Sequence, residues 1–98
     1  MSKLEKEIEK NLVKMVKANG GRCEKVICQG CSGFPDRTIL MPGGVVMFVE
    51  TKRPKGGRYS ALQDKWRDWL NDMGHMYFRV KDTEDIKWLE LMIKGAML

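Results

Sequence analysis

The run Val45–Glu50, five apolar residues followed by a glutamate, limits the possible folds more than any other segment. Its composition predicts a β-strand, and its lack of a polar face predicts that the strand is central in a sheet. Thr38–Met41 predicts a preceding strand, and Pro42-Gly43-Gly44 between the two is a hairpin signal. Other elements must therefore cover both faces of this hairpin.

The remaining elements follow from hydrophobic periodicity and from capping residues. They are, in order, a helix over Leu4–Ala18, a short strand within Arg22–Cys28 that includes the β-prone run Val26-Ile27-Cys28, a helix capped by Ser60 and ended by Gly74, a strand over Met76–Val80, and a last helix capped by Asp82 or Thr83. This order, αβββαβα, predicts an α/β fold: a small mixed sheet flanked by helices, in one domain spanning residues 1–98.

Length and charge narrow the class of protein. A chain of 98 residues has room for one core and not for two independent domains. The formal net charge of +5 favours a polyanionic partner, although a merely basic surface would give the same balance. The N-terminus is charged and lacks the apolar region of a signal peptide, and no run of about 18 apolar residues occurs. We therefore expect a cytoplasmic protein that does not contact a membrane.

Two acidic residues and one lysine are expected to converge at the predicted hairpin. Strand side chains alternate, so Glu50 and Lys52 point to one face and Thr51 to the other. The hairpin returns Asp36, which precedes its first strand, beside the end of its second strand. Metal-dependent phosphodiester hydrolysis needs such a group: Asp36 and Glu50 would bind Mg²⁺ or Mn²⁺, and Lys52 would orient water or stabilise negative charge. Taken alone, Glu-x-Lys also fits a solvated salt-bridge face.

The first predicted helix carries a carboxylate in an unusual position. A helical wheel places Glu5 between Leu12 and Val16, near the middle of the apolar face, and Glu9 follows one turn later. A buried carboxylate needs a cation or a metal as its partner. Alternatively, Glu5 lies at the helix edge, reaches solvent and stabilises the N-terminal end of the helix dipole. The helical pattern leaves both interpretations open.

Three short segments carry a family resemblance: Gly33-Phe34-Pro35-Asp36-Arg37, Val49-Glu50-Thr51-Lys52 and Ser60-Ala61-Leu62-Gln63. With the hairpin between the first two, they make the chain similar to the VRR-NUC branch of the PD-(D/E)XK nuclease superfamily, over nearly its whole length. The resemblance implies a PD-(D/E)XK-like domain that cuts DNA.

The resemblance also implies further site residues. Glu5 looks like the family's helix glutamate that joins the site, and Glu9 is a second, weaker candidate for that role. Gln63 stands where the family has a site glutamine, although it could equally be an ordinary polar residue of a first helical turn. The backbone carbonyl of Thr51 corresponds to the family's third metal ligand.

The last predicted helix has apolar residues on more than one side, with Trp88, Leu91 and Met92 outside its main stripe. One small sheet cannot cover all of them, which predicts a homodimer. Stand-alone members of the family resemble this chain in length and form homodimers. Two sites related by a twofold axis suit branched DNA or a Holliday junction, which implies DNA repair or recombination, in a phage-infected or bacterial cell.

Three other features have simpler interpretations. Arg53, Lys55 and Arg58 form a basic loop that could contact DNA phosphates or be merely solvated. The odd number of cysteines fits a reducing compartment, and Cys28-x-x-Cys31 lacks the further ligands of a structural zinc site, so we expect no zinc. The three tryptophans, Trp66, Trp69 and Trp88, are expected in the core rather than stacked on bases.

These inferences predict a Mg²⁺- or Mn²⁺-dependent endodeoxyribonuclease. Without a recognition helix or a base-reading pattern in the sequence, we expect DNA to be selected by shape. The main alternative is a non-catalytic basic DNA-binding module with structural acidic residues. A third possibility is a small protein that binds a partner protein through its apolar last helix.

Overall fold

The computed structural model describes residues 3–53 and 56–98, in which the predicted order of elements is present with one short 3-10 turn added. The elements are α1 (Lys3–Ala18), β1 (Arg22–Lys25), β2 (Arg37–Met41), the 3-10 turn (Pro42–Gly44), β3 (Val45–Thr51), α2 (Ala61–Asp72), β4 (Met76–Val80) and α3 (Thr83–Ala96). The predicted α/β fold class, a small mixed sheet flanked by helices, is confirmed.

The strands form one sheet in the order β1-β2-β3-β4. β1 pairs with β2 and β2 with β3 in antiparallel fashion, whereas β4 pairs with β3 in parallel. The parallel pair needs a long crossover, and α2 provides it. β3 therefore has a strand on each side, which is the central position that its apolar sequence predicted.

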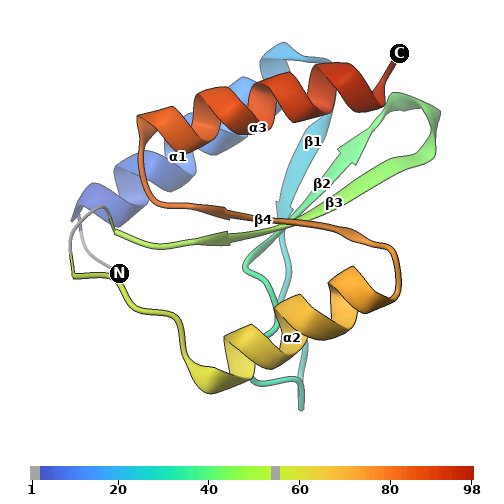
Figure 1. Cartoon of the computed structure of the whole chain (residues 1–98). Helices are drawn as coiled ribbons and strands as arrows, with labels where there is room; N and C mark the ends of the chain where they lie inside the picture. Colours follow the sequence, from blue (N-terminus) through green and yellow to red (C-terminus); the bar gives the residue numbers. More distant parts are fainter. Residues whose placement is uncertain (1–2, 54–55) are drawn as a thin grey trace.

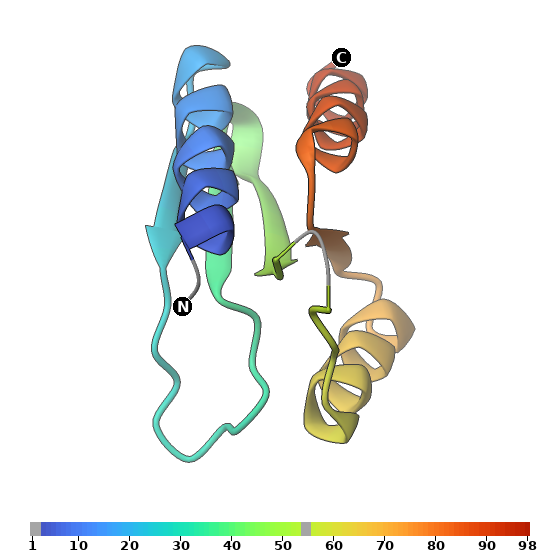
Figure 2. The same cartoon turned by 90° about the vertical axis from the view of Figure 1, so that its left-hand side faces the viewer.

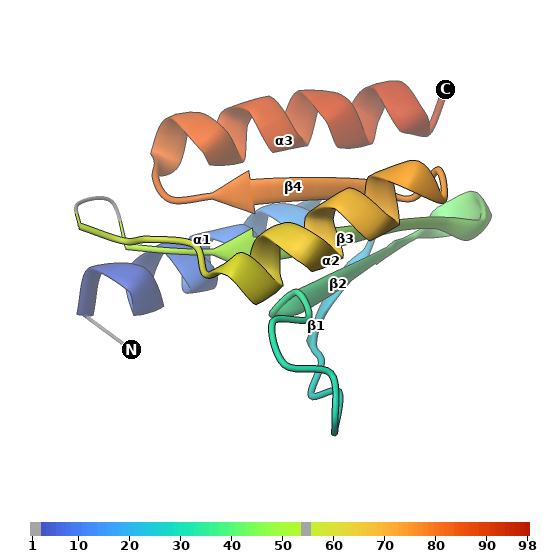
Figure 3. The ribbon, with the colours of Figure 1, turned by 60° about the horizontal axis from the view of Figure 1, so that its bottom comes forward.

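Helices cover both faces of the sheet (Figure 1). α1 and α3 pack against each other and on the strands, while α2 packs on β4 from the opposite side. Figure 3 shows this directly, with α2 in front of the strands and α1 behind them. Figure 2 shows the 26–36 loop at the same end of the molecule as α2. This end of the sheet carries the residues of chemical interest.

The alternation of β3 divides its side chains between the two faces. Met47 and Val49 are fully buried in the core that α1 and α3 cover. Phe48 and Glu50 point to the opposite face, where Phe48 makes an edge contact with Phe34 of the 26–36 loop. The main core consists of Ile8, Leu12, Met15, Val16, Cys23, Ile39, Met41, Met47, Val49, Val80, Ile86, Leu89 and Ile93.

The strand prediction was wrong at Val26-Ile27-Cys28. β1 ends at Lys25, which pairs with Arg37, the first residue of β2. The residues after Lys25 have no strand beside them, so their β propensity has no hydrogen-bonded partner to act on. The backbone N–H of Val26 instead donates to the carbonyl of Asp36 and closes the 26–36 loop.

Two of the three tryptophans lie at the surface, which corrects the expectation that all three are core residues. Trp69 is 51% exposed and Trp88 is 62% exposed, whereas Trp66 is half-buried under the 26–36 loop. Trp69 lies on α2 and Trp88 on α3. In both helices other residues, such as Leu70 and Leu89, form the buried side. Among residues 3–53 and 56–98, no helix has the length and apolar character required to cross a membrane.

An ion pair beneath α1 fixes that helix to the sheet. Glu9 is only 6% exposed, and its Oε1 accepts a hydrogen bond from Nε of Arg37 at 2.8 Å. Nη2 of Arg37 lies 2.7 Å from the same oxygen in the ion pair. Nη1 of Arg37 also donates to the carbonyl of Cys23, at 3.1 Å. Because Arg37 follows Asp36 directly, this pair also anchors the start of β2.

We expect Glu9→Gln to lower the free energy of unfolding by about 3 kcal/mol, because it leaves the buried guanidinium of Arg37 without a counter-charge. Urea denaturation measures the loss. The control is Glu24→Gln, which breaks an exposed pair with Arg22 and should cost less than about 1 kcal/mol. Equal losses in the two variants would contradict a structural role for Glu9.

Candidate active site

Asp36 is held at the end of β3 by that strand's last residue. Its Oδ2 accepts hydrogen bonds from the backbone N–H and from the hydroxyl of Thr51, both at 3.1 Å. The antiparallel register pairs Arg37 with Val49, and its continuation by one residue brings Asp36 opposite Glu50. The hairpin therefore brings the two carboxylates together, as the sequence predicted.

Glu50 is the most unusual side chain of the structure. It is 1% exposed, and neither carboxylate oxygen has a hydrogen-bond partner among residues 3–53 and 56–98. Burial first, and then the nearby carboxyl group of Asp36, raise the pKa of Glu50 to about 8, against the opposing effects of Lys52 and Gln63. Three other predicted site residues, Asp36, Lys52 and Gln63, thus lie around one buried carboxyl group.

Lys52 lies just beyond β3, on the same face as Glu50. Its backbone N–H donates to the carbonyl of Val80 at 3.0 Å, which extends the pairing with β4 by one residue. Its side chain is half-buried, and Nζ lies 5.7 Å from the centre of the Tyr59 ring. The ammonium group therefore lies over the Tyr59 ring, and its charge lowers the pKa of Glu50.

Gln63 serves both as a helix cap and as a neighbour of Glu50. The side-chain Oε1 of Gln63 accepts a hydrogen bond from the backbone N–H of Ser60 at 2.8 Å. The backbone N–H of Gln63 donates to Oγ of Ser60 at 3.1 Å. This capping box fixes the side chain in one orientation. The side-chain amide of Gln63 also lowers the pKa of Glu50. The two roles considered for Gln63 are therefore compatible.

The 26–36 loop connects Asp36 to α2. The indole N–H of Trp66 donates to the carbonyl of Ser32 at 3.1 Å, and the Phe34 ring packs edge-on against Trp66. Gly33, at φ +87°, passes so close to α2 that a Cβ atom there would lie 2.6 Å from the Leu62 carbonyl carbon. Only glycine fits this contact, which sets the distance between Asp36 and the helix that carries Gln63.

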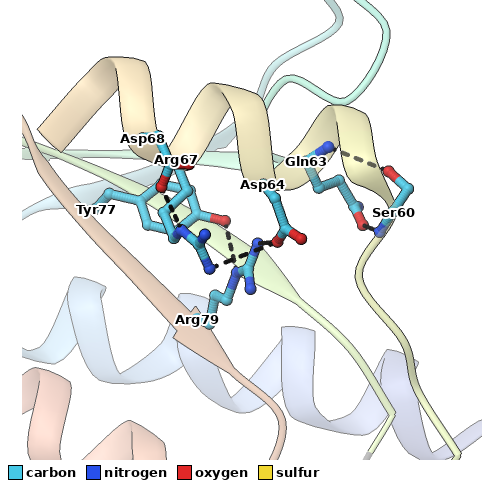
Figure 4. A network of polar contacts seen from close by, with 7 residues as sticks. All are labelled: Ser60, Gln63, Asp64, Arg67, Asp68, Tyr77 and Arg79. Atoms are coloured by element: carbon cyan, nitrogen blue, oxygen red, sulfur yellow. Dashed lines mark hydrogen bonds and ion pairs between the residues drawn. The ribbon is translucent and has the colours of Figure 1, made fainter. Parts of the chain in front are cut away.

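One side chain beside Glu50 was not singled out from the sequence, and two others bind it. Arg79 of β4 is the register partner of Glu50, and Asp64 and Tyr77 bind Arg79 (Figure 4). The alternation of β4, with Tyr77 and Arg79 on one face and Phe78 and Val80 on the other, is the signal that could have identified the arginine.

Glu5 lies on α1 and is half-buried. Within residues 3–53 and 56–98, no three His, Cys, Asp or Glu side chains lie close enough together to hold a metal ion. Glu5, Asp36 and Glu50 therefore do not form a metal-binding cluster in the described part of the chain, and the site role of Glu5 stays a prediction.

In the basic loop, Arg53 and Arg58 are exposed, and Nη2 of Arg53 donates to the carbonyl of Gly56 at 3.3 Å. Lys55 falls outside the described residues. The two arginines follow Lys52 closely in the chain, so their charges lie on the polypeptide segment that leaves the site.

The cysteines are arranged differently from the expectation of three reduced thiols. Cys28 and Cys31 are joined by a disulfide within the 26–36 loop. Cys23 is a buried thiol of β1, and burial raises its pKa to about 11. The odd number of cysteines favoured a reducing compartment, and the bond between Cys28 and Cys31 departs from that expectation.

The donors around Glu50 fit a hard divalent cation. Mg²⁺ and Mn²⁺ favour carboxylate and carbonyl oxygens, which Asp36, Glu50 and the backbone of Thr51 can provide. The two buried oxygens of Glu50 lack any other partner in the described part of the chain. A cation there would satisfy both oxygens and offset the repulsion between the two carboxylates.

Two comparisons with known proteins give the same domain family, and a third gives a nuclease. The family model described as "VRR-NUC domain" matches residues 2–81. The protein "Putative nuclease p44" of Acyrthosiphon pisum secondary endosymbiont phage 1 is 37% identical over 82 residues, which cover 84% of this chain and 86% of the relative. A solved structure titled "VRR_NUC domain" superposes with a TM-score of 0.84 at 26% identity, covering 90% of this chain and 95% of that one.

We expect Glu50→Gln to stabilise the protein in a chelator. As the pH rises from 4.5, the ordinary pKa, to about 8, the unfolded chain loses this proton while the folded protein keeps it, so the wild type loses stability across that window. The neutral amide avoids this loss. The Tm of the variant should therefore exceed that of the wild type in EDTA at pH 8 and approach it near pH 4.5.

Differential scanning calorimetry across this pH range measures the effect. Adding Mn²⁺ should raise the Tm of the wild type and not that of Glu50→Gln, because a ligand stabilises only the state that binds it. Glu7→Gln, at an exposed position of α1, is the matched control and should follow the wild type. A difference in Tm that is independent of pH would argue against the burial of an ionisable group.

Proposed function

Because the chain belongs to the VRR-NUC domain family, we propose that it is a metal-dependent endonuclease that hydrolyses phosphodiester bonds of DNA. Its nuclease character follows from the family. The proposed metal dependence rests on one observation, the buried carboxyl group of Glu50 beside Asp36, with no hydrogen-bond partner in residues 3–53 and 56–98. A folded protein retains such an arrangement at a cost in stability, which a bound cation offsets.

Each residue of the site has a proposed task. Asp36, Glu50 and the backbone carbonyl of Thr51 would hold Mg²⁺ or Mn²⁺, and the amide of Gln63, held by Ser60, would favour the charged form of Glu50 by lowering its pKa. When bound, the ion supplies positive charge at the scissile phosphate and Lewis acidity. Lys52 orients the attacking water and stabilises the negative charge that develops on the phosphate. Glu5 is proposed as an additional acidic residue of this site.

The DNA contacts are proposed on the segment that follows Lys52. Arg53 and Arg58 are exposed there, and Lys55 between them would add a third cation. Contacts of this kind bind phosphates and carry no sequence information. We therefore propose that the nuclease selects DNA by structure, with branched substrates such as Holliday junctions preferred, in repair or recombination in phage-infected or bacterial cells.

We also propose a homodimer that forms through α3. Trp88, Leu91 and Met92 are 62%, 59% and 46% exposed, which is unusual for large apolar side chains grouped on one helix. A second exposed group, Leu62, Trp69 and Met73, lies along α2. The α3 face lies on the side of the sheet opposite to α2, so a dimer through α3 leaves the α2 side open to DNA.

We expect purified protein to cut branched DNA in Mg²⁺ or Mn²⁺ and to stop when a chelator is added. Glu50→Gln and Lys52→Ala should abolish cleavage, and Asp36→Asn should reduce it at least about a hundredfold, because each acts on the charge of the transition state. Product formation on a panel of junction, flap, nicked and plain duplex DNAs measures these effects.

The control variant is Glu24→Gln, which removes a carboxylate from β1 and should cut like the wild type. Full activity of Asp36→Asn would refute the proposed site. Salt-sensitive DNA binding without any cleavage, unaffected by the chelator, would instead support the non-catalytic DNA-binding module.

For the assembly, we expect the wild type to sediment as a dimer and Leu91→Glu to sediment as a monomer, because a charge placed in the α3 face would be buried on association. Leu62→Glu, with a similar exposure on α2, is the matched control and should stay dimeric. Sedimentation equilibrium distinguishes these outcomes. A monomeric wild type, or dissociation caused only by Leu62→Glu, would contradict an α3 interface.

A further inference from the structure

An arginine lies beside Glu50 and does not pair with it. β3 and β4 are parallel, and their register makes Arg79 the partner of Glu50. Adjacent strands lie about 4.8 Å apart and paired positions point to the same face, so an arginine side chain can reach the neighbouring carboxylate. Yet both oxygens of Glu50 lack a hydrogen-bond partner in the described residues. Something must therefore direct the guanidinium elsewhere.

Three contacts hold Arg79 away from Glu50, and Figure 4 shows two of them. Nη2 donates to Oδ1 of Asp64 at 2.6 Å, and Nε donates to the hydroxyl of Tyr77 at 3.0 Å. The guanidinium also stacks on Tyr59, with its carbon 3.8 Å from the ring centre. Asp64 is the only one of the three partners that carries a full opposite charge, so it supplies the strongest of these contacts.

An ion pair between Arg79 and Glu50 would interfere with metal binding. A guanidinium next to Glu50 would give the carboxylate its missing hydrogen bonds and neutralise its charge. A divalent cation would then have to displace the arginine before it could bind. Asp64 lies on α2, one residue after Gln63, where it reaches Arg79 and stays 44% exposed. This places its carboxylate outside the site itself.

We propose that Asp64 is a positioning residue that holds Arg79 away from Glu50 and so keeps Glu50 open to a divalent cation. This inference rests on the proposed metal dependence of the nuclease. It also accounts for an arginine and an unpaired buried glutamate at paired positions of adjacent strands. Removal of Asp64 releases Arg79, which then turns to Glu50 and competes with the metal.

Calorimetric titration of the full chain with Mn²⁺ tests the proposal without reference to cleavage. We expect Asp64→Ala to weaken Mn²⁺ binding about tenfold or more, the range typical of residues that orient a metal ligand. Arg79→Met alone should bind Mn²⁺ like the wild type. The double variant Asp64→Ala/Arg79→Met should also bind like the wild type, because the competing cation is gone.

The matched control is Asp68→Ala. Asp68 lies one turn further along α2 and pairs with Arg67 at 2.9 Å. Its removal changes the net charge equally and breaks no contact of Arg79 itself. Arg67 also lies 3.5 Å from Oδ1 of Asp64, a longer contact than the 2.6 Å pair of Asp64 with Arg79, so that pair should persist and Mn²⁺ binding should not change. A loss as large as that of Asp64→Ala would show a general effect of charge and overturn the proposal. If Asp64→Ala fails to fold by circular dichroism, Asp64→Asn takes its place, with a smaller loss expected.

A crystal structure of metal-free Asp64→Ala gives the direct readout. We expect the guanidinium of Arg79 within hydrogen-bond distance of Glu50. A guanidinium that stays on Tyr59 and Tyr77 would overturn the proposal, as would a double variant that binds Mn²⁺ no better than Asp64→Ala.

Mn²⁺ binding by the wild type and by Glu50→Gln tests the proposed function separately from the role of Asp64. Wild-type protein that binds no Mn²⁺ would remove the metal dependence and the inference with it. If the wild type binds Mn²⁺, Glu50→Gln does not, and Asp64→Ala binds like the wild type, then the proposed function stands and the role of Asp64 is refuted.

Discussion

Burial of the Glu50 carboxyl group at the end of the central strand sets the conditions that the surrounding residues must meet. A carboxylate loses its hydration there, and the second acid, Asp36, adds repulsion. Packing alone does not require a glutamate at this position, because an apolar side chain would bury at lower cost. The arrangement is reasonable for a protein that gains free energy when a cation or a substrate binds, and function then accounts for a residue that stability disfavours.

Rigid contacts around Glu50 keep the site from relaxing. Thr51, which follows Glu50 in β3, holds Asp36 through two hydrogen bonds. The capping box with Ser60 fixes Gln63 at the start of α2. The 26–36 loop then joins these two parts through Trp66 and through the close approach of Gly33. Three segments that are distant in sequence thus meet at one carboxyl group. Their positions depend on backbone contacts more than on flexible side chains, which is what a preorganised site requires.

Local patterns in the sequence were sufficient to predict the order of the elements and the meeting of Asp36, Glu50 and Lys52, because strand alternation and a short hairpin fix these relations within a few residues. Predictions failed where a non-local partner decides the outcome. Val26-Ile27-Cys28 has strand propensity but no neighbouring strand, and the pairing of Glu9 with Arg37 depends on how α1 lies on β2. Arg79 was missed for the same reason, since only the parallel register of β3 and β4 places it beside Glu50.

The limits of the family match divide the chain into two parts with different physical roles. Residues 2–81 contain the strands β1 to β4 and the residues of the candidate site. α3 begins after them, at Thr83. α3 still contributes Ile86, Leu89 and Ile93 to the core, so the sheet needs an apolar cover at that position. The outer side of α3 is exposed at Trp88, Leu91 and Met92, and Trp88 and Met92 border a hollow together with Phe78 and Val80 of β4. A substitution at Leu91 therefore alters the exposed side of α3 and removes none of the contacts that hold Asp36, Lys52 and Gln63.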